Sequence, residues 1–381
     1  MPISLSCDEL LAWVRLGLEP GLGTRNAREA LARGGLPHEL YAQPMGMLGK
    51  LLGSTTLAAQ LKAAPPPAIQ AALDAALQWL EHPDHHLLTL ADDAYPKRLL
   101  DTPDPPLVLY VNGNPELLNQ PSIAVVGSRS ATAAGMDNAH AFSCFLAERG
   151  WHIVSGLAQG IDTAAHEGAL QARSTGASST IAVMATGIDL VFPARNRTLA
   201  HRIARDGALV SEFPLGQRAL PFHFPKRNRL VAALGHGVLV VEAAQKSGSL
   251  ITAKVAADLG REVFAIPGSI HSPLARGCHS LIKQGARLVE TGQDILDELG
   301  QFRFPAAGAT AAGRTTPEPA PRSPDEDAVL AAMDNQPVTL DKLEQRSKLN
   351  AGTLSAILLR LELDGRVERL EDGTFQARPP A

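Results

Sequence analysis

The chain of 381 residues has little cysteine and no long apolar run. Its three cysteines, Cys7, Cys144 and Cys278, are far apart, so their spacing fits neither a disulfide framework nor a metal site. No apolar run approaches the ~20 residues that a membrane-spanning helix needs. The acidic residues Asp8 and Glu9 near the N-terminus are unlike a signal peptide. We therefore expect a cytoplasmic protein with no metal and no membrane contact.

Several cofactor and catalytic motifs are also absent. The sequence has no Walker phosphate loop, no Gly-x-Ser-x-Gly elbow and no complete Gly-x-Gly-x-x-Gly fingerprint. We expect neither NAD nor ATP as a cofactor, and no catalytic residues. The formal net charge of −4 gives no overall positive field for nucleic acid. Any binding of nucleic acid must then depend on a local basic surface.

One stretch organises the chain. Residues 123–126 are apolar without polar alternation, which is typical of a strand buried on both faces. Gly127 allows a sharp turn, and residues 132–148 have the spacing of a helix. A strand, a glycine turn and a helix start present free backbone N–H groups, which bind anions. Arg129 adds a guanidinium suited to phosphate. The stretch therefore predicts a turn that holds the backbone of a nucleic acid.

Strand and helix patterns alternate through the middle of the chain. The expected strands are residues 107–111, 123–126, 152–155, 180–185, 208–212, 238–242, 262–266 and 287–289. Helices are expected between them, for example at 162–173 and 250–259. This pattern predicts an α/β fold, an extended Rossmann-like, doubly wound and mostly parallel sheet over residues 101–301. Ligands bind such sheets at the carboxyl ends of the strands.

The expected strand ends share small residues and polar groups. They occur at residues 127–129, 155–162, 186–189 and 247–249. Glycines let a ligand approach the backbone, and serines and amides supply hydrogen-bond donors. A single segment of this kind is most often an ordinary turn. Four of them at equivalent strand ends favour a cleft whose lining binds phosphate.

A basic segment with aromatic residues lies at 222–229. Its three cations suit phosphates, and a phenylalanine suits stacking on a base of a single strand. Residues 195–229 hold eight basic and two acidic residues, an excess of 8 − 2 = 6 in an acidic chain. The alternative is a solvated helix start whose rings pack in the core. The local charge favours nucleic-acid binding.

Two flanking domains are expected. Residues 1–100 predict a small helical domain, either helix-hairpin-helix-like (or SAM-like) or a plain bundle with a glycine turn, with helices at 8–18, 25–33 and 68–80. Residues 302–323 are low in large apolar side chains and predict a flexible linker. Residues 324–381 predict a winged helix, with helices at 325–333, 340–347 and 351–363 and a hairpin of 365–370 with 374–376. Its charge over 325–370 is 6 − 9 = −3, which favours contact with protein over DNA.

Three polar residues admit a second interpretation. Asp162 and His166 lie one helical turn apart, as an acid–base pair would, but we expect Asp162 to cap its helix and His166 to pack in the core. Glu242 ends an expected strand, where a related enzyme would place a general base.

Seven segments of the chain together resemble the DNA-processing protein A family (DprA, also called Smf). They are residues 124–129, 155–162, 207–212, 224–229, 241–243, 247–253 and 267–268. The order of a helical domain, a Rossmann-like core and a winged-helix tail is also similar to that of the family. One departure is Leu220-Pro221, where some relatives carry a lysine.

The resemblance implies a non-catalytic protein that binds single-stranded DNA in natural transformation. It further implies that the protein shields incoming strands, loads RecA recombinase and forms a homodimer. The residues expected to bind DNA are Gly127, Ser128, Arg129, Gly160, Phe224, Lys226, Arg227, Asn228, Arg229, Lys246, Ser247 and Gly248.

Two other functions stay open. The fold is similar to phosphoribohydrolases of the lysine-decarboxylase-like class, which share a Pro-Gly-Gly-x-Gly-Thr-x-x-Glu loop. Here Pro267-Gly268 is followed by Ser269-Ile270, and Glu242 precedes the serine-rich turn. A third possibility is a scaffold that binds only protein through its tail and its N-terminal helices.

Overall fold

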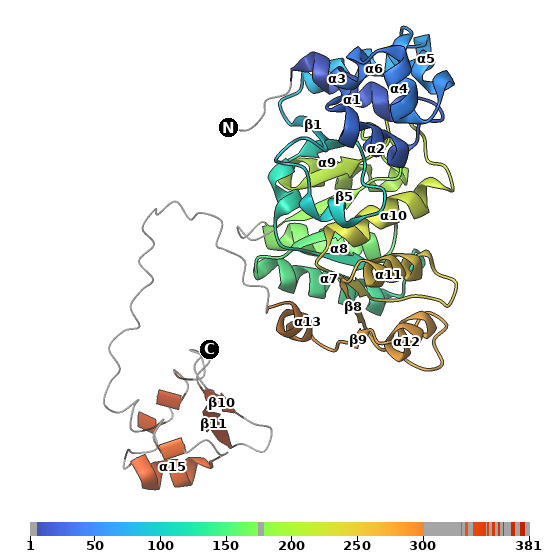
Figure 1. Ribbon diagram of the computed structural model, residues 1–381. Coiled ribbons are helices and arrows are strands. Elements are labelled where there is room, and N and C mark those ends of the chain that lie inside the picture. Colours follow the sequence, from blue (N-terminus) through green and yellow to red (C-terminus); the bar gives the residue numbers. More distant parts are fainter. Residues whose placement is uncertain are drawn as a thin grey trace. The chain divides into compact units, whose positions relative to one another are not determined.

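The structure is a computed structural model (Figure 1). It describes residues 6–173, 179–300 and, nearer the C-terminus, 329, 332–333, 338–347, 349, 353–354, 357–358, 361, 367–369 and 374–377. The chain forms two compact units, Met1–Phe304 and Pro305–Ala381. The expected linker, residues 302–323, lies outside the described residues, and the expected domain boundaries stay predictions.

Six short helices open the chain. They are α1 (Cys7–Leu18), α2 (Thr24–Gly34), α3 (Pro37–Ala42), α4 (Met45–Leu52), α5 (Thr55–Lys62) and α6 (Pro67–Leu80). The Ser6 hydroxyl caps α1 by accepting a hydrogen bond from the Glu9 N–H. Between α1 and α2, Gly21 and Gly23 take positive φ angles of 79° and 62°, which explains the glycine turn. The helices expected at 8–18, 25–33 and 68–80 match α1, α2 and α6.

One strand lies where only helix was expected. Strand β1 (His85–Thr89) pairs antiparallel with β2 (Val108–Gly113). Leu87 packs with the N-terminal helices, whereas Leu88 packs on the other side of the sheet. The expectation that residues 1–100 are all helical is therefore wrong at β1, because two adjacent leucines can each be buried on a different face of a strand.

Nine strands form one sheet in the order β1-β2-β6-β5-β4-β3-β7-β8-β9. The remaining strands are β3 (Ser122–Val126), β4 (His152–Ser155), β5 (Thr180–Val183), β6 (Ala208–Ser211), β7 (Gly237–Val240), β8 (Glu262–Ala265) and β9 (Arg287–Leu288). Strand β2 runs antiparallel to β1 and β6, and all other neighbours are parallel. The predicted Rossmann-like, mostly parallel sheet is confirmed.

Helices cover both faces of this sheet. On one face α7 (Ala133–Glu148), α8 (Ile161–Arg173) and α13 (Gly292–Leu299) pack on Ile123 and Val125 of β3. On the other face α10 (His223–Leu234), α11 (Gly248–Asp258) and α12 (Arg276–Lys283) pack on the side of Ala124 and Val126. Helix α9 (Arg197–Asp206) joins the apolar cluster of the N-terminal helices. The continuous apolar run of β3 is thus explained, since both of its faces are buried.

The strand order reverses at β3. From β3 the chain builds β4, β5 and β6 on one side, then returns to place β7, β8 and β9 on the other. Between β3 and β7 the connections therefore lead in opposite directions and leave a crevice at the carboxyl ends of the strands. Such a switch point is where open α/β sheets bind ligands.

The C-terminal unit has its own small core. Helix α15 (Leu340–Ser347) agrees with the expected helix at 340–347, and β10 (Val367–Arg369) pairs antiparallel with β11 (Phe375–Ala377) as the expected hairpin. Buried Val329, Met333, Leu343, Leu354, Leu358 and Leu361 pack together. The helices expected at 325–333 and 351–363 lie largely outside the described residues.

Candidate nucleic-acid interface

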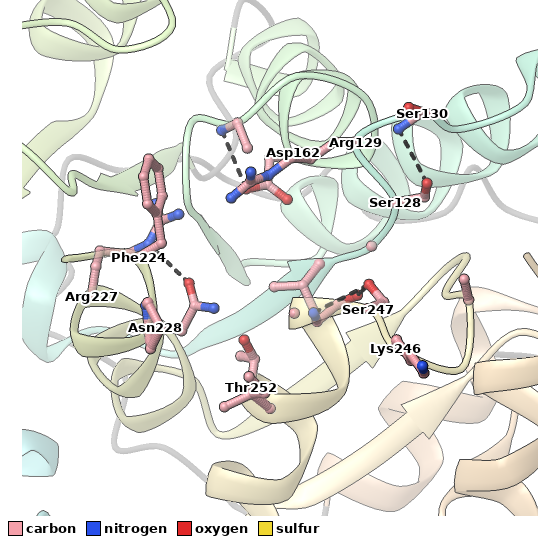
Figure 2. A pocket seen from close by; sticks show the side chains of 18 of the residues that line it. Ser128, Arg129, Ser130, Asp162, Phe224, Arg227, Asn228, Lys246, Ser247 and Thr252 are labelled. Atoms are coloured by element: carbon pink, nitrogen blue, oxygen red, sulfur yellow. Dashed lines mark hydrogen bonds between the residues drawn. The ribbon is translucent and has the colours of Figure 1, made fainter. Parts of the chain in front are cut away.

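A cleft of about 740 Å³ opens at the switch point (Figure 2). Its walls come from the turn after β3, the start of α8, the first turns of α10 and the loop that leads into α11. These four segments are far apart in the sequence, and the parallel sheet brings their ends to one edge. Nine of the twelve residues expected to bind DNA line this cleft: Gly127, Ser128, Arg129, Phe224, Arg227, Asn228, Lys246, Ser247 and Gly248.

The turn after β3 presents an exposed cation. The Ser128 hydroxyl is buried and accepts a hydrogen bond from the Ser130 N–H at 3.1 Å, which fixes the turn. Arg129 is exposed, and its guanidinium carbon lies 4.9 Å from the centre of the Phe224 ring. It forms no ion pair with any described residue. The ring holds the guanidinium at the cleft by a cation–π contact and leaves its N–H donors available.

The loop between β4 and α8 forms part of the cleft floor. The Asp162 carboxylate accepts hydrogen bonds from the Gly156 and Ala158 N–H groups at 3.2 and 3.3 Å. The expectation that Asp162 caps the first turn of its own helix is therefore wrong, because its carboxylate turns back to the preceding loop. Burial raises the pKa of the Asp162 carboxyl, and Arg227 opposes this shift most strongly.

Two further side chains hold the same loop. The Asn196 side-chain amide donates to the Leu157 carbonyl at 2.8 Å. His166 is fully buried, and its Nε2 accepts from the Leu157 N–H at 3.3 Å while its Nδ1 lies 2.7 Å from the Thr180 hydroxyl. Because that hydroxyl donates to the Ile153 carbonyl, Nδ1 carries the proton and donates to the Thr180 oxygen. His166 packs in the core as expected. No pattern in the sequence singles out Asn196, because its partners lie 33 to 39 residues earlier in the chain.

Arg227 lies beneath the cleft with only 3% of its surface exposed. Its Nη1 donates to the carbonyls of Gly156 and Val183, the latter at 2.5 Å. Its Nε donates to the Asn228 side-chain oxygen at 3.1 Å, which leaves the Asn228 nitrogen as a donor for the cleft. Burial lowers the pKa of the Arg227 guanidinium to about 10, so it stays charged at neutral pH. Gly156 has no side chain here because a Cβ would collide with this guanidinium.

The loop before α11 forms the opposite wall. The Ser247 hydroxyl caps α11 by accepting from the Ser249 N–H at 3.3 Å. The start of α11 at Gly248 and the exposed side chain of Lys246 both line the cleft. Helix N-termini carry partial positive charge and free N–H groups. This wall therefore suits an anion.

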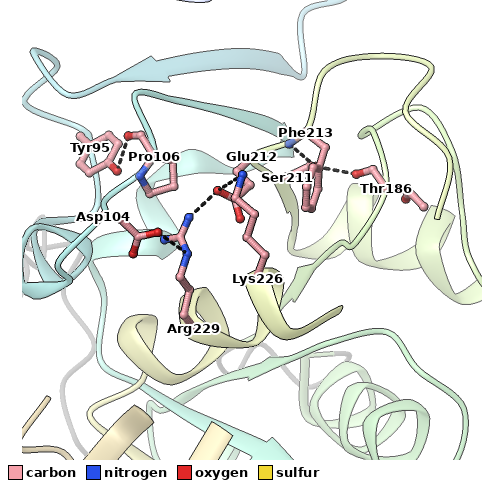
Figure 3. A network of polar contacts seen from close by, with 9 residues as sticks. All are labelled: Tyr95, Asp104, Pro106, Thr186, Ser211, Glu212, Phe213, Lys226 and Arg229. Atoms are coloured by element: carbon pink, nitrogen blue, oxygen red, sulfur yellow. Dashed lines mark hydrogen bonds and ion pairs between the residues drawn. The ribbon is translucent and has the colours of Figure 1, made fainter. Parts of the chain in front are cut away.

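Lys226 and Arg229 lie outside the cleft lining, in a network of ion pairs (Figure 3). Arg229 pairs with Glu212 at 2.5 Å and with Asp104 at 3.3 Å. Lys226 pairs with the same Glu212 at 3.4 Å. These two cations are compensated by two carboxylates, so the structure does not bring them to the cleft with Arg129. No observation tests their expected contact with DNA, and we expect these ion pairs to weaken it.

Gly160 is the third expected residue outside the lining. It takes φ +80°, and a Cβ there would collide with the Ser128 carbonyl. The glycine is needed for the two loops to approach each other, which explains it structurally. Its direct contact with DNA also stays a prediction.

Glu242 has a structural partner. Its carboxylate accepts hydrogen bonds from the N–H and the hydroxyl of Thr132, at 3.0 and 2.7 Å. Thr132 in turn caps α7 by accepting from the Gly135 N–H. Glu242 thus anchors the start of α7. This contact accounts for a carboxylate at the end of β7 without a general base.

The described residues contain no group of three side chains that could hold a metal ion. Cys7, Cys144 and Cys278 are free. No helix in the described ranges is both long and apolar enough to cross a membrane.

Comparison with known proteins identifies two regions. The family described as "DNA recombination-mediator protein A" matches residues 86–300, and "DprA winged helix domain" matches residues 313–373. Protein Smf of Escherichia coli K12 is 40% identical over 316 residues, covering 80% of this chain and 81% of the relative. DNA processing protein DprA of Streptococcus pneumoniae R6 is 48% identical over 210 residues, covering 55% of this chain and 73% of the relative.

Two solved structures are similar. DNA processing protein A from S. pneumoniae has a TM-score of 0.62 and 39% identity, covering 74% of this chain and 95% of that one. DNA processing protein A from Helicobacter pylori, a structure described for its single-stranded DNA binding mode, has a TM-score of 0.52 and 29% identity over 58% of this chain and 97% of that one. These names describe DNA processing and recombination, and none names a catalytic activity. With a family match over more than half of its length and an Smf relative aligned along most of both sequences, the chain belongs to the DNA recombination-mediator protein A family, DprA/Smf.

Proposed function

We propose that this protein binds single-stranded DNA in the cleft at the switch point, mainly through the phosphates. The proposal depends mainly on the surroundings of Arg129. This side chain is exposed, forms no ion pair among the described residues and is held at the cleft by Phe224. The H. pylori relative, described as a single-stranded DNA binder, supports the choice of ligand.

The two walls of the cleft suit a sugar-phosphate chain. Arg129 and Asn228 offer donors on one side, and Lys246 with the start of α11 offers them on the other. Phosphate contacts are independent of base sequence and depend on salt. The protein therefore takes strands of any sequence, as a protein that handles incoming DNA must.

We further propose that the bound strand is shielded from nucleases and passed to RecA recombinase during natural transformation, by a homodimer of this chain. The description of the family as a recombination mediator supports this role. The acidic winged helix contacts protein in this proposal, since its net charge of −3 over residues 325–370 disfavours phosphate.

A titration with fluorescein-labelled (dT)20 at several salt concentrations tests DNA binding. Replacing Arg129 with alanine removes a charged donor, so affinity falls tenfold or more, corresponding to ~1.5 kcal/mol for a charged hydrogen bond. The log–log salt slope becomes less steep by about 0.7 for each phosphate released. Arg205→Ala is the control, because Arg205 is exposed and already paired with Asp206 at 2.7 Å. Equal affinity of wild type and Arg129→Ala would remove Arg129 from the site.

Three further measurements test nuclease protection, RecA loading and dimer formation separately from DNA binding. Saturating protein is expected to slow nuclease digestion of (dT)20 and to speed RecA assembly on it, and sedimentation is expected to give a dimer. If DNA binds while RecA assembly is unchanged, binding stands and the loading role fails.

A further inference from the structure

Phe192 is a large aromatic side chain that the protein leaves in water. It lies between β5 and the short 3-10 helix η3 (Ala194–Asn196), and 52% of its surface is exposed. Its ring centre is 5.8 Å from that of Phe224, with the two planes at 61°. Phe224 lines the cleft, so Phe192 extends the aromatic surface of the cleft outward.

The ring of Phe224 already contacts two side chains of the protein. The Arg129 guanidinium lies over its ring at 4.9 Å, and Phe192 contacts it at an angle. A base stacking on the face that Arg129 covers would displace the cation that we assign to a phosphate. Phe192 has no such conflict, since no described cation lies over its ring.

The chain around Phe192 is basic. Arg195 and Arg197 follow within five residues, both are exposed, and neither forms an ion pair in the described ranges. Single-strand binders combine cations for the backbone with aromatic rings for the bases. Phe192 and these two arginines therefore place an aromatic ring near unpaired cations outside the cleft, as Phe224 and Arg129 do within it.

We propose that Phe192 stacks on a base of the strand as it leaves the cleft, while Phe224 supports Phe192 and holds Arg129. This inference rests on the proposed binding of single-stranded DNA and assigns a base contact to it. A nucleobase is the partner that suits the exposed ring, because the ring continues a cleft whose free cations suit a polynucleotide backbone.

The test compares two ligands with equal charge: labelled (dT)20, and an oligomer of the same length with tetrahydrofuran in place of every base. Phe192→Ala is expected to weaken (dT)20 binding about fivefold or more, since stacking on one base contributes ~1 kcal/mol or more. The same substitution leaves the base-free oligomer within about twofold and the salt slope unchanged, because no cation is lost. Phe192→Tyr keeps the ring and restores affinity for (dT)20.

Phe222→Ala is the matched control. Phe222 has 66% of its surface exposed, and it contacts His223 without lining the cleft. Its truncation leaves both affinities within about twofold. The inference is overturned if Phe192→Ala binds (dT)20 like wild type, or if it weakens both ligands equally. If wild-type protein binds neither ligand, the proposed function itself fails, which is a different result.

Discussion

Helix α10 carries cations on two faces that meet different surroundings. Phe224, Arg227 and Asn228 lie on one face and line the cleft. Lys226 and Arg229 lie on the opposite face and are paired with Glu212 and Asp104. The net charge of a segment therefore does not tell which of its cations are available to a ligand. On the cleft side, the free cations come from other elements, Arg129 and Lys246.

The largest expected effect concerns Arg227, on the cleft face of α10. Arg227→Met removes the donor to two carbonyls and takes from the buried Asp162 carboxylate the stronger of the two cations that stabilise it, the other being Arg129. The free energy of unfolding is expected to fall by about 3–5 kcal/mol, measured by urea denaturation. Adding Asp162→Asn is expected to recover part of this loss. Normal stability with lost DNA binding would instead make Arg227 a phosphate ligand.

A smaller effect is expected from His166, which makes the free energy of unfolding depend on pH. Burial, with Arg227 adding to it, lowers the pKa of His166 to about 3. His166 takes up a proton near pH 6.5 in the unfolded chain but only near pH 3 in the folded protein. Its contribution to the free energy of unfolding is therefore fully present above pH 6.5 and is lost as the pH falls toward 3. At pH 5 the loss from His166 is about 2 kcal/mol.

Urea denaturation at pH 7 and pH 5 measures this loss. The His166→Gln variant is less stable at pH 7, but its stability declines by about 2 kcal/mol less than that of wild type between these pH values. Parallel declines in wild type and variant would show that His166 binds its proton in the folded state.

The smallest effect is expected at two lysines, Lys246, which lines the cleft, and Lys226, which is paired with Glu212. Lys246→Ala is expected to weaken (dT)20 binding about fivefold and to reduce the log–log salt slope by about 0.7, as loss of one phosphate contact does. Lys226→Ala is expected to change affinity less than about twofold, because Glu212 already compensates Lys226. Fluorescence anisotropy measures both. Equal losses from the two variants would erase the distinction between the faces of α10.

Local pattern predicts part of the fold and of the site. The expected strand at 152–155 has the bounds of β4, and the expected turn at Gly127 lies at the cleft. The net charge of residues 222–229 does not predict which of their cations line the cleft. Helical spacing already separates Lys226 and Arg229 from Phe224 and Asn228, because residues three or four apart share a face.

Long-range contacts explain the remaining differences. Arg227 bonds to carbonyls 71 and 44 residues away in the chain, so no local pattern announces that it is buried. Asp162 bonds to the preceding loop because Gly156 and Ala158 turn their N–H groups toward it. The strand at β1 forms because β2 offers it an edge.

The sequence alone determined the alternation of strands and helices, the buried strand β3, the glycine turn after it and the resemblance to DprA/Smf. These features depend on side-chain periodicity and on local backbone freedom, which a sequence states directly. Only the tertiary structure decided which cations face the cleft and which are neutralised. The availability of a charge depends on the carboxylates and carbonyls that folding brings beside it, and those come from distant parts of the chain.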